Sequence, residues 1–388
     1  MEPNERFRAR RAEARRRKRR RRAALAGIVL CVVLVVAGGM TLAGKGTGSA
    51  KKTRSSDASV PLVVPAVTTG PRPLPLEIRG VHVTGPLASL PGKLQEYVGY
   101  KKYGLNTIEL DVKDEGGVVN FVPSAVPMAQ RIGASRPYVR MREAARLAHS
   151  HGVYLICRLV VFQDPVLARA RPDLAVRTTG GAVWTTNGGL AWVNPYDRRV
   201  WDYSVSIAEA ASRAGCDEIM LDYVRFPSDG DVTRAVYPGS TRQPRGRVIA
   251  DFVAYAHKRL APLGVRVSTA LFGLSATRDL RIGQVPRWIS AHVENVSPMA
   301  YPALYSDGEL GIAKPSSEPG ETVFRTLADF RNAVRGSQVQ LVPWIQDWNY
   351  TPAEVQQQVD AVRLHGAKGF LLWNAAGRYT REALAPPP

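Results

Sequence analysis

Residues 141–162 have the sequence MREAARLAHSHGVYLICRLVVF, in which an amphipathic segment is followed by a glycine and then by an apolar run. Four apolar residues of this segment share one helical face: Met141, Ala144, Ala145 and Ala148. Gly152 supplies the left-handed backbone position at which many helices end. The stretch therefore predicts a helix that leads directly into a buried strand.

The same order of helix, glycine and apolar run recurs along the chain, at Gly104, Gly152, Gly215, Gly264, Gly336 and Gly366. The last of the predicted helices has a clear start, because Thr351 is a good cap, Pro352 suits the first helical position, and Glu354 completes a capping box. Val355, Val359 and Val362 lie on one face of this helix. Strands that alternate with helices in this way predict a parallel sheet with right-handed crossovers.

Eight strands are predicted, near residues 79–83, 107–112, 153–161, 218–224, 266–271, 294–299, 339–345 and 369–373. Eight such units predict the α/β fold class and a (β/α)₈ TIM barrel. An open doubly wound sheet is the alternative, but it would more naturally carry a glycine-rich phosphate loop after its first strand, which residues 79–92 lack. The unit after the eighth strand, residues 378–384, is too short for a complete helix.

The N-terminal region divides into three predicted segments. Residues 1–22 are a basic tail with twelve Arg or Lys and three Glu, residues 23–44 are uncharged, and residues 45–76 form a Gly-, Ser- and Pro-rich linker. An apolar stretch of about 20 residues suits a transmembrane helix. We expect residues 77–388 to form the barrel domain.

Much of the net charge of +20 comes from the basic tail, residues 1–22. The net charge therefore does not indicate nucleic acid as a partner. Under the positive-inside rule, the basic tail stays in the cytoplasm and the barrel is extracytoplasmic, so we expect a single-pass membrane protein. A cleaved signal peptide is the alternative, but its apolar region is usually shorter than residues 23–44. We expect no disulfide: Cys31 lies in the apolar stretch, and Cys157 and Cys216 are expected to be buried as small apolar residues.

In a barrel of this type the active site lies where the strands end. Asp111 and Asp222 follow apolar strand residues and form the predicted pair of catalytic carboxylates, with Asp347 as a third candidate. We expect Arg225 to keep a neighbouring carboxylate ionised. Glu109 lies one step deeper on the same strand as Asp111 and is expected to pair with Arg158.

Further polar and aromatic residues at the strand ends and in the segment after the third strand are predicted to bind substrate: Asp164, Trp192, Tyr196, Tyr223, Arg225, Tyr301, Gln346, Trp348, Trp373 and Asn374. Aromatic rings suit a carbohydrate groove, although a single Trp more often packs in the core. We expect no cofactor and no catalytic metal, because His82 is the only histidine at a predicted strand end. The sequence also lacks the motifs of serine hydrolases and P-loop NTPases.

Several stretches resemble the bacterial glycoside hydrolase family DUF4015 in the same order, among them RGVHVTG, LNTIELDVKDEGG, LICRLVVFQDPVLA, WVNPYDRRVWDYSVSIAEAA, CDEIMLDYVRFPSD, SPMAYP, VPWIQDW and GFLLWNAAGRY. The resemblance implies a TIM barrel with a glycosidase-like site. The site positions that it carries over are Asp111, Asp164, Tyr196, Asp222, Arg225, Tyr301, Gln346 and Asn374. The sequence departs from the family pattern at Ala270, where an acid is usual, and at Ala303-Leu304, which replace Ser-His.

These observations predict a membrane-anchored extracytoplasmic glycoside hydrolase that acts on a cell-envelope or extracellular polysaccharide. The alternative is a catalytically impaired barrel that still binds glycans, which the residues at positions 270, 303 and 304 favour. A scaffold in envelope assembly is a third hypothesis. Retention or inversion of configuration stays open, because the sequence does not give the distance between the carboxyl groups.

Overall fold

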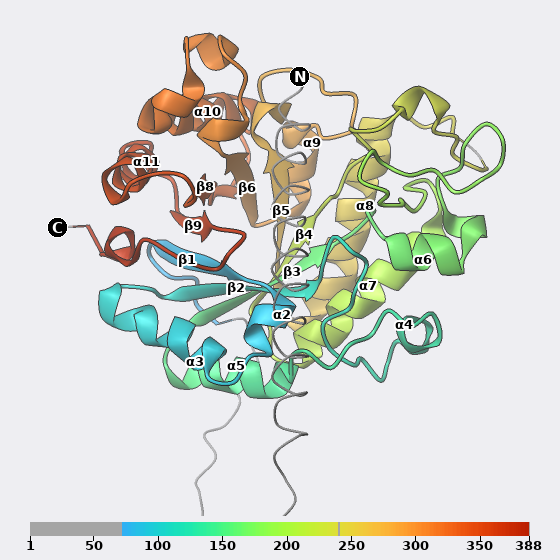
Figure 1. Cartoon of the computed structure of the whole chain (residues 1–388), viewed down its shortest axis with the longest axis horizontal. Helices are drawn as coiled ribbons and strands as arrows, with labels where there is room; N and C mark the ends of the chain where they lie inside the picture. The colour runs from blue at the N-terminus through green and yellow to red at the C-terminus, as the bar shows by residue number, and fades with distance from the viewer. Residues whose placement is uncertain (1–71, 240, 388) are drawn as a thin grey trace, which may run out of the picture. The chain divides into compact units, whose positions relative to one another are not determined.

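The computed structural model describes residues 72–239 and 241–387. Its strands form one parallel sheet: β1 (Ile78–Val83), β2 (Thr107–Lys113), β3 (Tyr154–Val160), β4 (Glu218–Asp222), β5 (Arg266–Phe272), β6 (Asn295–Ala300), β7 (Gln340–Leu341), β8 (Trp344–Gln346) and β9 (Gly369–Trp373). They are hydrogen-bonded in the order β5-β4-β3-β2-β1-β9-β8-β6-β7, and β5 also pairs with β6. The sheet is therefore a closed barrel, as predicted, and not an open sheet (Figure 1).

The seventh of the eight predicted strands consists of two short pieces. β7 pairs with the start of β6, and β8 pairs with the end of β6. Pro343 stands between the two pieces, and a proline has no N–H to donate to a sheet. The two segments together therefore occupy one of the eight positions around the barrel.

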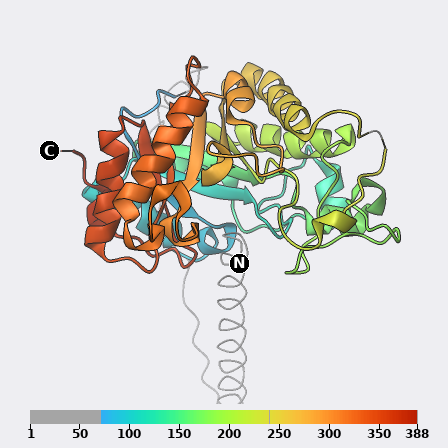
Figure 2. The same ribbon diagram turned by 90° about the horizontal axis from the view of Figure 1, so that it is seen from above.

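The helices surround the barrel: α2 (Gly85–Ala88), α3 (Lys93–Val98), α4 (Pro127–Arg131), α5 (Met141–Ser150), α6 (Pro165–Ala170), α7 (Arg198–Arg213), α8 (Arg245–Leu260), α9 (Pro286–Ile289), α10 (Pro319–Ala333) and α11 (Pro352–Leu364). Helices α7 and α8 pack side by side, and α10 and α11 form another pair on a different side of the barrel (Figures 1 and 2). The predicted apolar faces of α5 and α11 are buried, and the capping box at Thr351 and Glu354 is present.

The six glycines that mark the joints between helices and strands all have left-handed backbone angles. Their φ values are 108° at Gly104, 67° at Gly152, 112° at Gly215, 68° at Gly264, 86° at Gly336 and 64° at Gly366. Residues with a Cβ atom rarely adopt this conformation. The repeated glycine was therefore a reliable sign of where each helix turns into the next strand.

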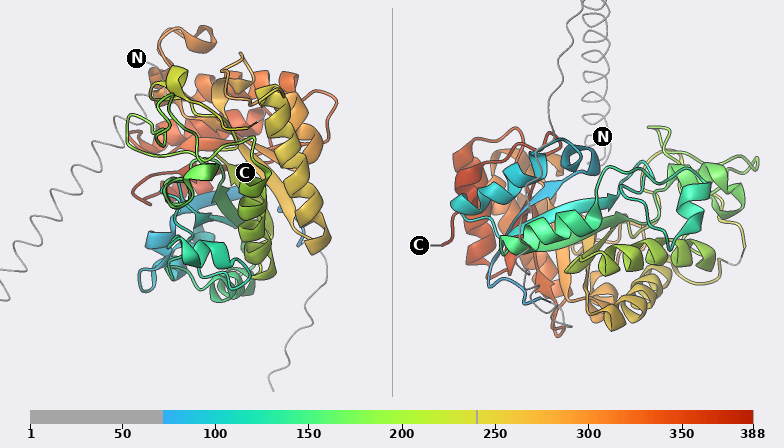
Figure 3. Two further views of the ribbon diagram at one scale, coloured as in Figure 1. Left: turned by 90° about the vertical axis from the view of Figure 1, so that its right-hand side faces the viewer. Right: turned by 90° about the horizontal axis from the view of Figure 1, so that it is seen from below.

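The two ends of the described chain close the barrel. β1 pairs in parallel with β9, and Figure 3 shows the blue first strand beside the red C-terminal elements. After β9, the final unit holds only the 3₁₀ turn η10 (Arg381–Leu384), as its length predicted. We call residues 374–387 the C-terminal strap. The hydroxyl of Tyr379 in this strap donates a hydrogen bond to the carbonyl oxygen of His82, and Tyr97 donates to Gly377 O at 2.7 Å.

The expectation that Cys157 and Cys216 remain separate is wrong. The two residues form a disulfide with a Cα–Cα distance of 5.9 Å. It joins β3 to the turn between α7 and β4, which are neighbours in the barrel. The pattern of apolar residues gave no sign of this bond, because Cys residues in buried strands usually serve as small apolar side chains.

The predicted tail (residues 1–22) and transmembrane anchor (residues 23–44) lie outside the described residues, as does most of the predicted linker. Within residues 72–239 and 241–387, no helix has the length and apolar character needed to cross a membrane.

Candidate active site

The candidate active site is a group of charged side chains on the inner faces of β1 to β4. His82 stands opposite Glu109 in the pairing of β1 with β2, and Asp111 stands opposite Arg158 in the pairing of β2 with β3. Asp222 is the last residue of β4. Strands buried on both faces are normally apolar throughout. Burial of charged residues at these positions therefore costs folding free energy unless the charges are paired.

Arg158 joins the two carboxylates that were predicted to be catalytic. Its Nη1 atom donates to Asp111 Oδ1 at 2.6 Å, and its Nε and Nη2 atoms donate to Asp222 Oδ2 at 2.9 and 2.6 Å. Because both oxygen atoms contact one planar guanidinium group, they lie at most roughly 7.5 Å apart. That limit is compatible with the carboxyl separations of glycosidases.

This arrangement corrects the expected pairing of Glu109 with Arg158. Arg158 pairs with Asp111 and Asp222, whereas Glu109 pairs with His82. Arg225 makes no direct ion pair within the described ranges, although its charge and that of Asp222 attract each other. The sequence did contain a sign of the role of Arg158, because this residue is a single charge inside the apolar run LICRLVVF.

The backbone at the end of β4 adds to the fixed geometry of Asp222. Tyr223 has a φ of 51°, which is rare for a residue with a side chain. Its amide donates a hydrogen bond of 2.6 Å to Asp222 Oδ1. Both oxygen atoms of Asp222 are thus held by donors, and unusual backbone conformations of this kind are often found at functional sites.

His82 lies between two carboxylates. Its Nδ1 atom contacts Glu109 Oε2, and its Nε2 atom lies 3.5 Å from Asp111 Oδ2. Burial opposes protonation of the imidazole, but the charges of Glu109 and Asp111 outweigh it and raise the pKa of His82. Burial also raises the pKa of Asp111 to about 6, against the opposing effects of Arg158 and His82.

A further carboxylate near this group was missed by the sequence analysis. Glu115 Oε2 lies 3.9 Å from Arg158 Nη1, and 18% of the Glu115 side chain is exposed. Asp111 and Asp222 are almost completely buried by comparison. Glu115 follows the acidic residue Asp114 in a turn after β2, where charged side chains are usually exposed to solvent.

Three of the predicted aromatic residues form one cluster beside this group. The ring centroids of Tyr301 and Trp348 lie 5.2 Å apart, those of Trp348 and Trp373 5.1 Å, and those of Tyr301 and Trp373 5.9 Å. Trp373 also stacks on His82 at 6.2 Å. Trp348 is the partly exposed member of the cluster. We call these three residues the aromatic platform.

A second aromatic group surrounds Arg225. Its guanidinium carbon lies 4.8 Å from the ring centroids of Trp192 and Tyr223 and 4.5 Å from that of Phe272. Trp192 is fully buried, and its indole nitrogen has no hydrogen-bond partner among the described residues. Tyr196 packs instead against Phe226 and Tyr237. Trp192 and Tyr196 therefore contribute to packing around the site.

Four other predicted site residues have contacts that stabilise loops. Asp164 caps α6 through Leu167 N at 2.9 Å and pairs with Lys113 at 3.1 Å. Both oxygen atoms of Asp347 accept hydrogen bonds from Thr380 in the C-terminal strap, at 2.7 and 2.8 Å. The side chains of Gln346 and Asn374 also bond to backbone groups of neighbouring loops: Ala303 N and Trp348 O for Gln346, Asp347 O and Ala376 N for Asn374.

The positions at which the sequence departs from the family pattern lie around the same end of the barrel. Ala270 is fully buried on β5, and Leu304 lies in a short turn directly after β6. Ala303 donates its amide to Gln346 Oε1 at 2.9 Å. Ala270, Ala303 and Leu304 have no side-chain group that can take part in acid–base chemistry.

Among the described residues, His82, Glu109 and Asp111 are the one group whose possible metal-ligand atoms all lie within 4.8 Å of each other. These atoms already contact one another, and Asp111 is also held by the cation Arg158. A second cation beside them would be repelled by the guanidinium. The contacts therefore fit a hydrogen-bonded group better than a metal centre.

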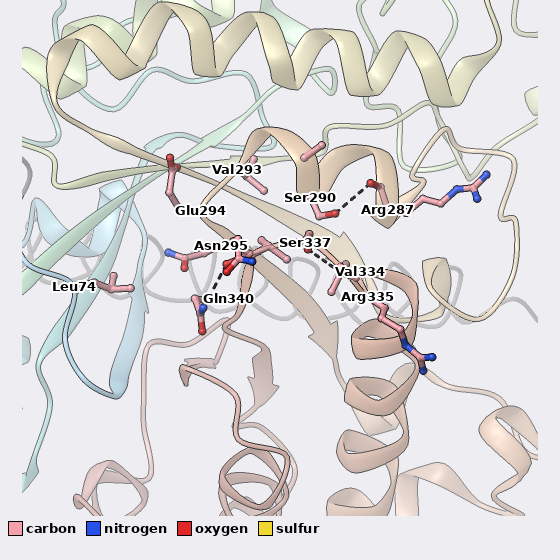
Figure 4. A pocket seen from close by; sticks show the side chains of 14 residues that line it. Leu74, Arg287, Ser290, Val293, Glu294, Asn295, Val334, Arg335, Ser337 and Gln340 are labelled. Atoms are coloured by element: carbon pink, nitrogen blue, oxygen red, sulfur yellow. Dashed lines mark hydrogen bonds between the residues drawn. The ribbon is translucent and has the colours of Figure 1, made fainter.

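A cavity of about 670 Å³ lies at the opposite end of the barrel (Figure 4). Asn295 and Gln340, which begin β6 and β7, line it together with Arg287, Glu294 and Arg335. Asp111 and Asp222 stand at the other ends of their strands. This cavity is therefore separate from the candidate active site.

Comparison with known proteins agrees with this geometry. A family model described as "Putative glycosyl hydrolase domain" matches residues 80–379, which include every strand end named above. The chain belongs to the DUF4015 family. The predicted resemblance is confirmed, and the DUF4015 domain of this chain is a glycoside hydrolase-like barrel.

Solved structures provide further matches to the DUF4015 domain. A hypothetical protein from Ruminiclostridium thermocellum is 32% identical, with 49% of this chain and 96% of that chain covered and a TM-score of 0.45. The glycoside hydrolase domain of PgaB (BpsB) from Bordetella bronchiseptica is 14% identical, with 81% and 100% covered and a TM-score of 0.59. The second similarity concerns the fold alone. No curated protein matches the sequence.

Proposed function

We propose that the DUF4015 domain hydrolyses glycosidic bonds, with Asp111 as the general acid and Asp222 as the nucleophile or base. The observation that carries this proposal is the shared contact of both carboxylates with Arg158. Their environments differ, because the pKa of Asp111 is raised to about 6 whereas Asp222 accepts three hydrogen bonds. Carboxylates with different environments are the arrangement that glycosidases use to separate the two roles.

The aromatic platform supports a sugar substrate. Trp373 stacks on His82, which contacts the acid Asp111, and Tyr301 and the partly exposed Trp348 pack against Trp373. The apolar faces of pyranose rings pack well on aromatic side chains. Asp347, the third predicted catalytic candidate, has both oxygen atoms bonded to Thr380, so we assign it to the support of the site.

We further propose that the domain acts outside the cytoplasm on an envelope or extracellular polysaccharide. The basic tail (1–22) and the apolar segment (23–44) favour an N-terminal anchor with the N-terminus in the cytoplasm, followed by a linker and the barrel from residue 77. The disulfide between Cys157 and Cys216 supports this location, because such bonds persist mainly in oxidising compartments.

The test is to incubate the full-length chain, purified in detergent, with cell-wall glycans and exopolysaccharides, and to measure the release of reducing ends. Asp222→Asn and Asp111→Asn should each lower the rate by about 10²–10⁴-fold. Asp173→Asn, at an exposed carboxylate that pairs with Arg171, is the matched control and should retain the activity. A rate that survives Asp222→Asn would contradict the assignment of Asp222.

The second candidate function is glycan binding without hydrolysis. Ala270 and Ala303-Leu304 favour it, because they replace groups that the family pattern places at this end of the barrel. In that case calorimetry would detect glycan binding that Trp348→Ala weakens, while no reducing ends are released from any glycan tested.

A further inference from the structure

The group around His82 extends the predicted pair of carboxylates by two residues. Glu109, His82 and Asp111 form a continuous series of contacts, since Nδ1 of the imidazole faces Glu109 and Nε2 faces Asp111. Both carboxylates lie on β2 and point to the same side of the strand, two residues apart. The histidine comes from β1, where it stands opposite Glu109 in the register.

Glu109 determines which nitrogen of His82 can exchange a proton. A carboxylate beside Nδ1 keeps a hydrogen on that atom, so that Nε2 is the atom that gains or loses the second proton. Nε2 faces Asp111 Oδ2, whereas Asp111 Oδ1 accepts a hydrogen bond from Arg158. The proton of the acid therefore belongs on Oδ2, next to the imidazole.

The surroundings of His82 suit an imidazole that is protonated for part of a reaction cycle. The groups that face it are Glu109 and Asp111 on β2, Arg158 on β3, Trp344 on β8, Trp373 on β9, and Tyr379 in the C-terminal strap. The two carboxylates favour the cation and Arg158 opposes it. The indole rings, at 5.9 and 6.2 Å, also favour a cation.

We propose that His82, held by Glu109, is a positioning residue that stores the proton which Asp111 gives to the leaving sugar. This inference rests on the proposed hydrolase function. The pair of His82 Nε2 and Asp111 Oδ2 holds one mobile proton. When the glycosidic C–O bond breaks, His82 Nε2 gives this proton to Asp111 Oδ2, which passes it to the leaving oxygen, and the imidazole becomes neutral. The proton released by the water that attacks the sugar then returns to Nε2.

The first test follows the imidazole itself and needs no substrate. The full-length chain is labelled with ¹⁵N-histidine, and the ring signals are followed from pH 5 to 9. We expect the Nε2 signal of His82 to titrate while Nδ1 stays protonated. Glu109→Gln should lower the midpoint by about one pH unit, since it removes an adjacent negative charge.

His149→Gln is the matched control. His149 also pairs with a carboxylate, Asp217, at 3.0 Å, but this pair lies near the start of β4 rather than at its end. The His149→Gln substitution should leave the His82 signal unchanged. A His82 midpoint that is identical in the wild type and Glu109→Gln would overturn the proposal. Stoichiometric binding of Zn²⁺ that is lost in Glu109→Gln would also overturn it, because the group would then be a metal site.

The second test uses a glycan that the wild type cleaves. The alkaline limb of the kcat/KM profile should coincide with the His82 midpoint and move to lower pH with it in Glu109→Gln. His82→Gln should lower kcat by about tenfold with little change in KM. An alkaline limb that does not follow the His82 midpoint would contradict the proton-storing role. If no glycan is cleaved, the hydrolase function fails, whereas the titration still reports on the His82 contacts.

Discussion

Arg158 holds Asp222 through two of its nitrogen atoms, because Nε and Nη2 both donate to Oδ2, at 2.9 and 2.6 Å. The third nitrogen, Nη1, is directed to Asp111. A single guanidinium therefore sets the relative position of the two carboxylates, and a lysine with one ammonium group cannot reproduce this fork.

Loss of Arg158 should destabilise the barrel strongly. Arg158→Met leaves Asp111 and Asp222 buried without their main counter-charge, and such losses cost about 3–5 kcal/mol. The measurement is the free energy of unfolding in urea at pH 7. Arg171→Met, which removes an exposed pair with Asp173, is the control and should leave the unfolding midpoint unchanged. Equal effects of the two substitutions would contradict the assigned role of Arg158.

The two tryptophans Trp348 and Trp192 should respond differently to replacement. Trp348 is partly exposed in the aromatic platform, so Trp348→Ala should weaken glycan binding by about tenfold with little loss of stability. Trp192 is fully buried, so Trp192→Ala should cost about 3–5 kcal/mol of stability. Calorimetry with a bound glycan and urea unfolding separate the two effects. Weakened binding in a Trp192→Ala protein that keeps its full stability would reverse this assignment.

The disulfide should contribute to stability. Cys157 and Cys216 are 59 residues apart in sequence, and a cross-link of this kind typically stabilises a protein by about 2–4 kcal/mol. The double substitution Cys157→Ala and Cys216→Ala should lower the free energy of unfolding by this amount in oxidising buffer. Dithiothreitol should lower the midpoint of the wild type but not of the variant. Titration of two extra free thiols in the unreduced wild type would show that the bond is absent.

Glu218 should make the stability of the barrel depend on pH. It is buried at the start of β4, where it accepts hydrogen bonds from Tyr154 at 3.2 Å and Asn295 at 2.8 Å, and burial raises its pKa to about 7. The folded state thus binds a proton more tightly than the unfolded chain, whose Glu has a pKa of 4.5. Stability contributed by this group is complete below pH 4.5 and is lost as the pH rises to about 7.

The check is urea unfolding of the wild type and Glu218→Gln at pH 5 and pH 8. The amide cannot ionise, so the variant should lose less stability than the wild type between these two values. Glu96→Gln serves as the comparison, because Glu96 is an exposed residue whose pKa is lowered by Lys93. The same change with pH in all three proteins would argue against the role of Glu218.

Much of the barrel could be predicted because its repeating units are local. A helix that ends in glycine before an apolar strand depends on neighbours in the sequence, and six of the eight strands are marked in this way. The break in the seventh strand at Pro343 was not predicted. It depends on which backbone N–H groups of this strand bond to β6, and that requires the register between the two strands. The disulfide was missed because it depends on the distance between two strands.

The site was harder to predict than the fold. Asp111 and Asp222 could be named as candidates because each follows a run of apolar strand residues, a property that is visible in the sequence. Their link through Arg158 was not found, since it requires the register between β2, β3 and β4. The contacts of Asp347 with Thr380 depend in the same way on where the C-terminal strap lies.

The C-terminal strap limits where tags can be attached and which changes of chain length the site can tolerate. It bonds to the backbone of His82 through Tyr379 and to Asp347 through Thr380, so the strap supports groups on two sides of the site. A stop codon shortly after Trp373 would spare every strand yet remove these supports. Affinity tags or fused domains at this end therefore need a spacer, and natural length changes here would alter the enzyme without touching its sheet.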